Sequence, residues 1–290
     1  MAGILYYAFG GGLGHLTRAR AVRHTLGLDG PFTVLCSSPF ACDPRIVDDL
    51  SPWVAPKNLE LDSVAFRAWI QEAMDRFRPD AFFVDAFPGG ILGELCGFPF
   101  PKDLELVHIG RILRCSVYSA LLDGPLPRFR RTWLVESIPE EQERVLARIS
   151  LSVEQLELRD PPTVPRGANP EALRTRWNGL GKPIWLVVHS GPDDETKDLV
   201  AYARECAAAE GVFPHFVLAS PGASPVECVE HIDLHPASRL FPHVDRIVTA
   251  AGFNSIRQTK PWRSKHLCLP FPRRLDDQFL RKRLTITESV

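Results

Sequence analysis

Short apolar runs alternate along the chain with longer stretches in which apolar residues recur every three or four positions. The short runs predict strands, and the longer periodic stretches predict amphipathic helices. Strands are expected at residues 4–9, 32–36, 81–84, 104–109, 132–135, 184–188, 213–219, 246–249 and 266–269. Helices are expected at residues 16–28, 64–77, 139–149, 193–210, 253–259 and 276–284. Because most strands are apolar throughout, we expect an α/β fold of parallel sheets with helices on both faces.

A stretch rich in proline and glycine, residues 159–183, interrupts this alternation. It predicts a linker between an N-terminal domain at residues 1–158 and a shorter C-terminal domain at residues 184–290. A short helix at residues 170–177 stays open. The β–α alternation on each side is typical of two Rossmann-like domains, whose sheets bind ligands beyond the carboxyl ends of their strands. With two such domains, we expect the binding site in a cleft between them.

Composition narrows the class of protein further. The 290 residues include 34 basic and 35 acidic side chains, and 45% are hydrophobic, which is typical of a globular protein. A net charge of −1 disfavours a nucleic-acid partner, because such proteins usually carry a basic surface. No apolar run reaches the roughly 18 residues of a membrane-spanning helix. Residues 1–9 lack the charged start of a signal peptide and are expected to form the first strand.

Cysteine and histidine usage argues against a metal site. The seven cysteines are scattered, and no two form a Cys-x-x-Cys pair. This pattern favours reduced thiols and a cytoplasmic location, with attachment to a membrane surface left open. His231 and His235 are four residues apart, but Pro236 argues against a helix that presents both. A loop or surface role is expected for them and for His243.

The first candidate cluster is the glycine-rich turn between the first strand and the first helix. Gly11, Gly12 and Gly14 allow a ligand to approach the backbone, and the helix start offers free N–H groups to an anion. The turn matches neither a dinucleotide fingerprint nor a P-loop. His15 stands at the positive end of the helix, which favours a neutral imidazole able to accept a proton near pH 7. Alternatively, His15 only caps the turn.

The second candidate is Asp85, at the carboxyl end of the strand expected at residues 81–84. A carboxylate at this position faces the expected cleft. Asp85 could orient His15 or act as the base itself. Alternatively, it only caps a helix that starts near Gly89.

The third candidate cluster lies in the C-terminal domain. Gly252 allows close backbone approach, and the amides of Asn254 and Ser255, with the Ser255 hydroxyl, can hold a phosphate. Gln258 lies one turn further along and can reach a sugar hydroxyl. Asp277 and Gln278 start the last expected helix, and adjacent Asp and Gln side chains suit a polyhydroxylated ligand. Taken alone, that pair is as well explained by helix capping.

Together, the three clusters resemble glycosyltransferases built from two Rossmann-like domains, the GT-B type. The likeness is to family 28-like proteins, the group that contains the bacterial GlcNAc transferase of lipid II synthesis. The matching motifs are Gly-x-Gly-His-x-x-Arg at residues 12–18, Asp-x-Phe-Pro at 85–88, Ala-Gly-Phe-Asn-Ser at 251–255 and Pro-Phe-Pro-Arg-Arg-Leu-Asp-Asp-Gln at 270–278.

The resemblance implies inverting sugar transfer from a nucleotide sugar, commonly a UDP-sugar, to an acceptor that it does not identify: a small molecule, a glycan or a lipid-linked compound. The C-terminal domain would bind the donor, and Asp277 and Gln278 would touch its sugar. The N-terminal domain would bind the acceptor, with His15 near its hydroxyl and Arg18 in the acceptor loop. No metal or other cofactor is implied, since helix dipoles and amides stabilise the leaving diphosphate. The residues implied to hold the diphosphate are His189, Ser190, Gly191, Gly252, Phe253, Asn254 and Ser255.

This chain departs from the family pattern at three places. Gln258 stands where the family usually has a glutamate on the ribose, and Arg281 and Lys282 stand where it usually has Asn-Ala. Relatives also usually continue beyond the position of Val290. A C-terminal domain as short as this one would leave a helix or a sheet edge uncovered, and a second copy of the chain could cover it. Two other functions stay open: a nucleotide-sugar hydrolase on the same fold, and a sugar-nucleotide-binding protein without catalysis.

Overall fold

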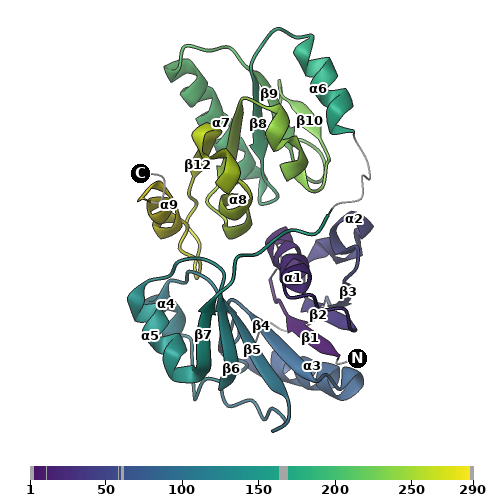
Figure 1. Ribbon diagram of the computed structural model, residues 1–290, viewed down its shortest axis with the longest axis vertical. Helices are drawn as coiled ribbons and strands as arrows, with labels where there is room; N and C mark the ends of the chain where they lie inside the picture. The colour runs from purple at the N-terminus through teal and green to yellow at the C-terminus, as the bar shows by residue number, and fades with distance from the viewer. Residues whose placement is uncertain (1–2, 11, 58, 60–61, 163–168, 288–290) are drawn as a thin grey trace. The chain divides into compact units, whose positions relative to one another are not determined.

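A computed structural model describes residues 3–10, 12–57, 59, 62–162 and 169–287. The chain divides into two compact units (Figure 1). Unit 1 comprises Met1–Pro161 together with Arg274–Asp277, and unit 2 comprises Pro162–Arg273 together with Gln278–Val290. The chain therefore returns to unit 1 for four residues near its end, which the hydrophobic pattern does not predict.

Unit 1 contains a seven-stranded parallel sheet in the order β3-β2-β1-β4-β5-β6-β7, counted over the described residues. Its strands are β1 (Ile4–Tyr7), β2 (Phe32–Cys36), β3 (Ser51–Val54), β4 (Ala81–Asp85), β5 (Glu105–Gly110), β6 (Phe129–Leu134) and β7 (Ser150–Gln155). The sequence-adjacent β1 and β2 pair with Ile4 opposite Phe32, while β4 pairs on the other side of β1. This reversal of strand order beside β1 places the carboxyl ends of β1 and β4 next to each other, where such sheets bind ligands.

Helices cover this sheet on both faces. They are α1 (Leu13–Thr25), α2 (Pro44–Val47), α3 (Ser63–Phe77), α4 (Cys115–Ser119) and α5 (Glu140–Ile149), with a 3-10 turn η1 (Pro39–Cys42). The Asp62 carboxylate caps α3 by accepting hydrogen bonds from two backbone amides of its first turn. The buried stripe of α3, which includes Trp69 and Ile70, packs on Leu5 and Tyr7 of β1. On the opposite face, α1 lies beside the end of β4.

Unit 2 contains a five-stranded parallel sheet in the order β10-β9-β8-β11-β12 over the described residues. Its strands are β8 (Ile184–Val188), β9 (His215–Ala219), β10 (Glu230–Ile232), β11 (Arg246–Ala250) and β12 (His266–Leu269). Its helices are α6 (Pro170–Asn178), α7 (Asp193–Ala209), α8 (Phe253–Gln258) and α9 (Gln278–Thr287), with 3-10 segments η2 (Ala237–His243) and η3 (Lys260–Lys265). Trp185 and Leu186 of β8 point into two different apolar cores, one on each face. Both faces are therefore buried, which is why the strand is apolar throughout.

The expected fold class, α/β with two Rossmann-like domains, is confirmed: the two units hold separate sheets in which neighbouring strands run parallel. The bounds of β2, β8 and β12 match the expected strands. Strands β3, β7 and β10 were not expected, because they are short edge strands that leave several residues exposed or half-exposed.

Four helix starts differ from expectation. Helix α1 begins at Leu13 rather than at residue 16, and α3 begins at Ser63 rather than at residue 64. Pro139 is the N-cap of α5 rather than a residue of its first turn. The last helix begins at Gln278 and not at residue 276, because Leu275 is buried in an apolar cluster of unit 1 with Phe87 and Tyr118.

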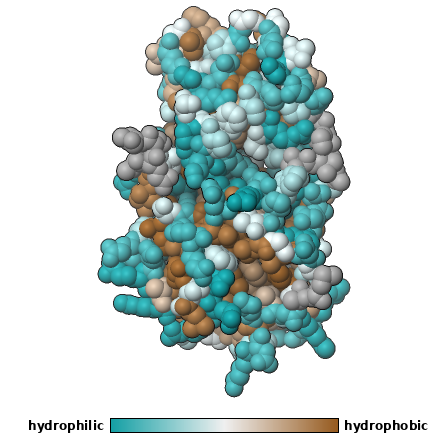
Figure 2. Space-filling model, viewed as in Figure 1, coloured by the Kyte–Doolittle hydropathy of each residue, from teal (hydrophilic) through white to brown (hydrophobic). Residues whose placement is uncertain are grey.

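The two units also differ at their surfaces. On the face seen in Figure 2, hydrophobic residues gather on unit 1, whereas the visible surface of unit 2 is mostly hydrophilic. Among the described residues, no helix combines the length and the apolar character that crossing a membrane requires.

Candidate functional site

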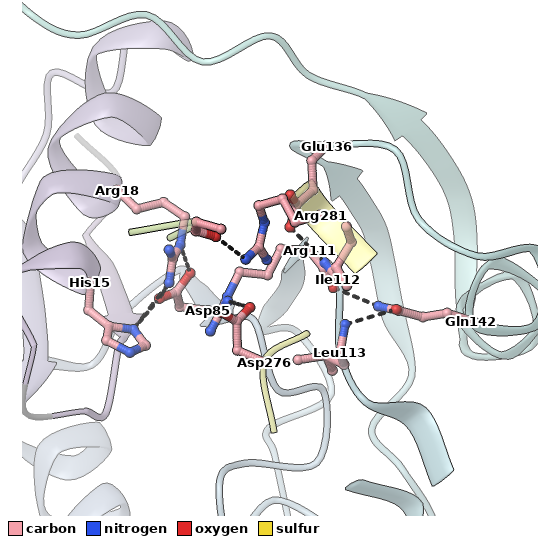
Figure 3. A network of polar contacts seen from close by, with 11 residues as sticks. His15, Arg18, Asp85, Arg111, Ile112, Leu113, Glu136, Gln142, Asp276 and Arg281 are labelled. Atoms are coloured by element: carbon pink, nitrogen blue, oxygen red, sulfur yellow. Dashed lines mark hydrogen bonds and ion pairs between the residues drawn. The ribbon is translucent and has the colours of Figure 1, made fainter. Parts of the chain in front are cut away.

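His15 and Asp85 meet at the carboxyl edge of the unit 1 sheet (Figure 3). Asp85 ends β4, and His15 lies in the first turn of α1, which follows β1 after a short loop. Because β1 and β4 are paired neighbours, both side chains reach the same place. The His15 Nδ1 atom lies 2.7 Å from Oδ2 of Asp85. The sequence thus identified two residues, 70 positions apart, that form one hydrogen-bonded pair.

Two further side chains, with three donor atoms between them, hold the Asp85 carboxylate in place. The Arg18 guanidinium donates from Nε to Oδ1 and from Nη2 to Oδ2, each at 2.5 Å. The hydroxyl of Tyr6 donates to Oδ1 at 3.2 Å from within the sheet. Burial alone would raise the pKa of Asp85, but the charge of Arg18 and the hydrogen bonds from His15 and Arg18 hold it well below its usual range. Asp85 is therefore a carboxylate at neutral pH, buried and paired.

The state of His15 follows from this carboxylate. Burial lowers the pKa of His15 from its ordinary value, while the hydrogen bond and the charge of Asp85 act in the opposite direction. A neutral imidazole beside an ionised Asp85 carries its proton on Nδ1 and donates it to Oδ2. The Arg18 Nη2 atom lies 3.2 Å from the same nitrogen, which makes this a contact between two donors and not a hydrogen bond.

The other ring nitrogen of His15, Nε2, has no hydrogen-bond partner within the described part of the chain. Its lone pair is available to a ligand. Gly10 makes room for this ring, because a Cβ atom at position 10 would lie 2.4 Å from Nε2. Any residue other than glycine at position 10 would displace the imidazole ring of His15.

Two alternative interpretations of this cluster are not supported. The N-cap of α1 is Gly12, without a side-chain cap, so His15 does not cap the turn. No helix begins near Gly89 among the described residues, so Asp85 caps none, and the chain instead turns sharply at Ala86 with φ of 68°. That turn is closed by a 2.8 Å hydrogen bond from the amide of Phe87 to the carbonyl of Asp85.

The remaining residues of the glycine-rich turn have different positions. Gly14 lies in the first turn of α1, and Gly11 lies outside the described residues. Arg18, expected in the acceptor loop, is only 3% exposed and faces Asp85. Its guanidinium is thus committed to the carboxylate.

Arg111 is a neighbour of this site that the sequence analysis missed. It follows β5 directly, is buried, and pairs with Asp276. Its guanidinium lies 5.7 Å from the ring centre of Phe87, and its charge contributes to lowering the pKa of His15. Gln142 fixes the backbone here by donating to the Arg111 carbonyl at 2.6 Å (Figure 3). The rule applied to Asp85, a charged residue at the end of a buried strand, would also have found Arg111.

In unit 2, the turn before α8 is open at Gly252. Gly252 is the N-cap of α8 with an ordinary φ of −67°, and a Cβ placed there would meet only Ser255 Oγ, at 3.9 Å. Neither backbone conformation nor protein packing therefore requires a glycine at this position. Phe253 is buried beneath the turn, whereas Asn254 and Ser255 are half-buried. Gln258, also half-buried, is the last residue of α8.

His189 lies at the end of β8, with its Nε2 3.1 Å from Oε2 of Glu195. Burial lowers the pKa of His189, and Glu195 opposes that shift. Arg273 also binds Glu195, with 2.5 Å between Nη2 and Oε2. Gly191 is explained by protein packing, because a Cβ there would lie 2.5 Å from Nε2 of His189. Ser190 is exposed.

The segment at the start of α9 is bonded mainly through buried side chains. Gln278 is buried, and its amide oxygen accepts a 3.0 Å hydrogen bond from the amide of Phe271. Asp277 is half-buried and belongs to unit 1. Arg281, where the family usually has asparagine, is buried and donates to the carbonyl of Ala251 at 3.0 Å. This places a positive charge beside the Gly252 turn, which the sequence marked only as a departure.

In the part of the chain that the structure describes, no group of three or more His, Cys, Asp or Glu side chains is arranged to hold a metal ion. His231 instead contacts Ser220, with its Nε2 3.1 Å from the Ser220 carbonyl oxygen.

No protein-family model matches the sequence, and no curated protein matches it. Several solved structures share the fold. The glycosyltransferase SsfS6 of Streptomyces sp. SF2575 is 12% identical with a TM-score of 0.61, over 99% of this chain and 86% of that one. The UDP-GlcNAc 2-epimerase of Neisseria meningitidis, bound to UDP-GlcNAc, is 12% identical with a TM-score of 0.55, over 98% and 85%.

The spinosyn rhamnosyltransferase SpnG, complexed with thymidine diphosphate, is 13% identical with a TM-score of 0.53, over 99% of this chain and 90% of that one. At such low identities the likeness defines the fold and not the reaction. The chain therefore has the fold of two Rossmann-like domains that GT-B glycosyltransferases share with the epimerase.

Proposed function

We propose that this protein transfers a sugar from a nucleotide sugar to an acceptor hydroxyl, with His15 as the general base. The observation that carries this proposal is the His15–Asp85 pair: Nδ1 is held by an ionised carboxylate, and Nε2 is left to a ligand. The fold supports it, because proteins with the same fold include glycosyltransferases, one of them complexed with thymidine diphosphate.

The proposed step is a single displacement that inverts the anomeric carbon. Nε2 of His15 takes the proton of the acceptor hydroxyl while the acceptor oxygen forms a bond to the anomeric carbon. The bond from that carbon to the diphosphate oxygen breaks, and its electron pair leaves with the nucleoside diphosphate. Asp85 stabilises the imidazolium that forms, as a buried carboxylate does beside a catalytic histidine.

The donor is assigned to unit 2. Gly252, which no protein contact requires, leaves space for a phosphate against the backbone. The Ser255 hydroxyl, in the first turn of α8 after Gly252, can donate a hydrogen bond to that phosphate. These features take over the role of a metal ion, so we propose that transfer needs none.

A UDP-sugar is the proposed donor, and the motif resemblance to the lipid II GlcNAc transferase group supports it. Gln278 is bonded to Phe271 and is better suited to shaping the loop than to binding the sugar directly. Asp277 remains the proposed sugar contact. The acceptor is proposed only as a hydroxyl compound.

The test is a panel of UDP-, dTDP- and GDP-sugars. Thermal shift identifies the donor, and release of nucleoside diphosphate is then measured with and without candidate acceptors. Acceptor-dependent release in the presence of a chelator supports a metal-independent transferase. Release that is independent of any acceptor indicates a hydrolase, in which Nε2 activates water. Binding without any release across the panel contradicts the proposal and favours a non-catalytic binding protein.

A further inference from the structure

A row of hydrogen-bonded polar side chains crosses the interior of unit 1 and ends at the turn beside Asp85. The hydroxyls of Ser150 and Thr132 lie 2.7 Å apart, and Thr132 Oγ1 lies 3.3 Å from Nδ1 of His108. The Nε2 atom of His108 lies 3.2 Å from the carbonyl oxygen of Ala86. His108 and Thr132 are fully buried. Buried polar side chains are costly unless they are bonded, so this row calls for an explanation.

The carbonyl oxygen of Ala86, at the end of the row, fixes the direction of the two hydrogen bonds that His108 makes. A carbonyl oxygen only accepts, so Nε2 of His108 must carry the proton and Nδ1 must accept from the Thr132 hydroxyl. Burial lowers the pKa of His108 to about 4, which keeps the ring neutral, as this arrangement requires.

The hydrogen bond from His108 ends at Ala86, a residue with an uncommon backbone conformation. Ala86 has φ of 68°, a left-handed conformation that residues with a side chain rarely adopt. Its amide donates to the Ile109 carbonyl at 3.0 Å, and the Phe87 amide donates to the Asp85 carbonyl. Such a conformation persists only where surrounding contacts hold it, and it is characteristic of functional sites.

Asp85 and His108 lie on opposite faces of the sheet. Val84 and Leu106 pack in the core under α3, and His108, two residues after Leu106, points to that same face. Asp85 follows Val84 and points to the other face, where it meets His15 and Arg18. The turn at Ala86 is therefore the covalent connection between the two faces.

We propose that His108 is a positioning residue for the His15–Asp85 pair: its N–H holds the Ala86 carbonyl, and the turn so fixed directs the Asp85 carboxylate at Nδ1 of His15. The catalytic consequence of this inference rests on the proposed function, whereas its structural consequence does not. His108 itself touches neither the substrate nor His15.

The test follows the His15 ring by NMR in the ligand-free protein. His108→Leu removes the donor to Ala86, and His108→Gln offers a side-chain N–H in its place. In His108→Leu we expect His15 to lose its preference for the Nδ1–H form and its pKa to fall further, because the opposing effect of Asp85 weakens. A displacement of about 1 Å in a catalytic group costs up to about 10²-fold in rate, so kcat should fall by about 10- to 100-fold with KM for the donor unchanged. His108→Gln should restore most of both properties.

His266→Leu is the matched control for loss of a buried histidine. Burial also lowers the pKa of His266 to about 4, and its two ring nitrogens contact Thr249 and Thr259 in unit 2. Its loss should leave the His15 signals unchanged. If His108→Leu does not fold, Thr132→Val, which removes only the hydroxyl that bonds Nδ1, serves as the second variant and should shift the His15 signals in the same direction.

Unchanged His15 signals and kcat in folded His108→Leu, or in Thr132→Val where the first variant does not fold, would overturn the inference. The NMR result also separates the two proposals. A His15 shift in a protein that turns over no nucleotide sugar supports the positioning role and contradicts the proposed function. Turnover by the wild-type protein, with the His15 signals unmoved in His108→Leu, supports the proposed function and contradicts the positioning role.

Discussion

The candidate sites of the two units are built in different ways. In unit 1, side chains from separate strands and helices bind each other: Arg18 and Tyr6 hold Asp85, and Asp85 holds His15. In unit 2, a Cβ placed at Gly252 would meet Ser255 Oγ only at 3.9 Å, and the Gln278 and Arg281 side chains nearby bond to backbone groups. The proposed role of His15 as a base requires the ring to point in one direction, and the contact with Asp85 fixes that direction. The proposed phosphate site, by contrast, needs only close approach to the backbone, which Gly252 allows.

This contrast predicts that the largest stability loss comes from the unit 1 cluster. Arg18→Met leaves the Asp85 carboxylate buried without its guanidinium. Breaking a buried ion pair costs about 3–5 kcal/mol, which urea unfolding at pH 7 would measure.

Arg273→Met is the matched variant in unit 2. Two nitrogens of Arg273 also bind a carboxylate, the one of Glu195, but a third of the Arg273 side chain is exposed. Solvent screens such a pair, so its loss should cost less. Equal losses in the two variants would contradict the distinction between the units.

Acid should destabilise the protein in a range of pH set by its buried histidines. Burial lowers the pKa of His108 to about 4 in the folded protein, against about 6.5 in the unfolded chain. The folded state therefore disfavours the proton, and stability present above pH 6.5 is lost as the pH falls toward 4. The loss amounts to about 3 kcal/mol for His108. Urea unfolding across this range measures it, and the slope should be shallower in His108→Gln.

Asp85 contributes in a different range. Its folded pKa is depressed, so the stability that it provides is present above its unfolded pKa of about 3.9 and is lost only below that value. A slope between pH 6.5 and 4 that is unchanged in His108→Gln would show that this histidine is not the cause.

Donor binding should depend on the open turn of unit 2. At a ligand concentration of about 100 times Kd, a nucleotide sugar stabilises the protein by about 2.7 kcal/mol. Ser255→Glu places a negative charge and extra bulk where the diphosphate is assigned, and it should abolish this thermal shift. Ser255→Ala should keep part of it. A normal shift in Ser255→Glu would remove the donor from this turn.

The smallest expected effect concerns the binding of the sugar part of the donor, as distinct from the binding of its nucleotide part. Asp277→Ala should weaken the binding of the nucleotide sugar by about 1.5 kcal/mol, which is the contribution of one hydrogen bond to a charged group. Binding of the free nucleoside diphosphate should be nearly unchanged. Calorimetry with both ligands checks this, and equal weakening of the two would refute the assignment of Asp277 to the sugar.

The sequence predicted most of the fold because its central strands carry continuous apolar runs. Strands β2 and β8, for example, have the predicted bounds, since burial on both faces favours apolar residues throughout them. Edge strands such as β7 have no such signal. The return of the chain to unit 1 at Arg274–Asp277 was not predictable either, because it depends on the burial of Leu275 against residues distant in sequence.

The candidate site was predicted in part, for a similar reason. The positions of His15 after β1 and of Asp85 at the end of β4 were enough to predict that the two residues belong to one site. The hydrogen bonds from Arg18 to Asp85 were not predicted, because the family resemblance implied that Arg18 lies in the acceptor loop. His108 was invisible, because a histidine inside an apolar run gives no sign of what its ring contacts across three strands.

The central claim is that His15 acts as the base and Asp85 orients it, and turnover of His15→Ala tests this most directly. His24→Ala, on the exposed end of the same helix, is the control. A general base contributes about 10²–10⁴-fold, so His15→Ala should lose that much in kcat with donor affinity intact, and His24→Ala should lose nothing. Adding Asp85→Asn to His15→Ala should then change little, since the two residues act as a unit. Full turnover in His15→Ala, with activity lost in Asp85→Asn alone, would contradict the account.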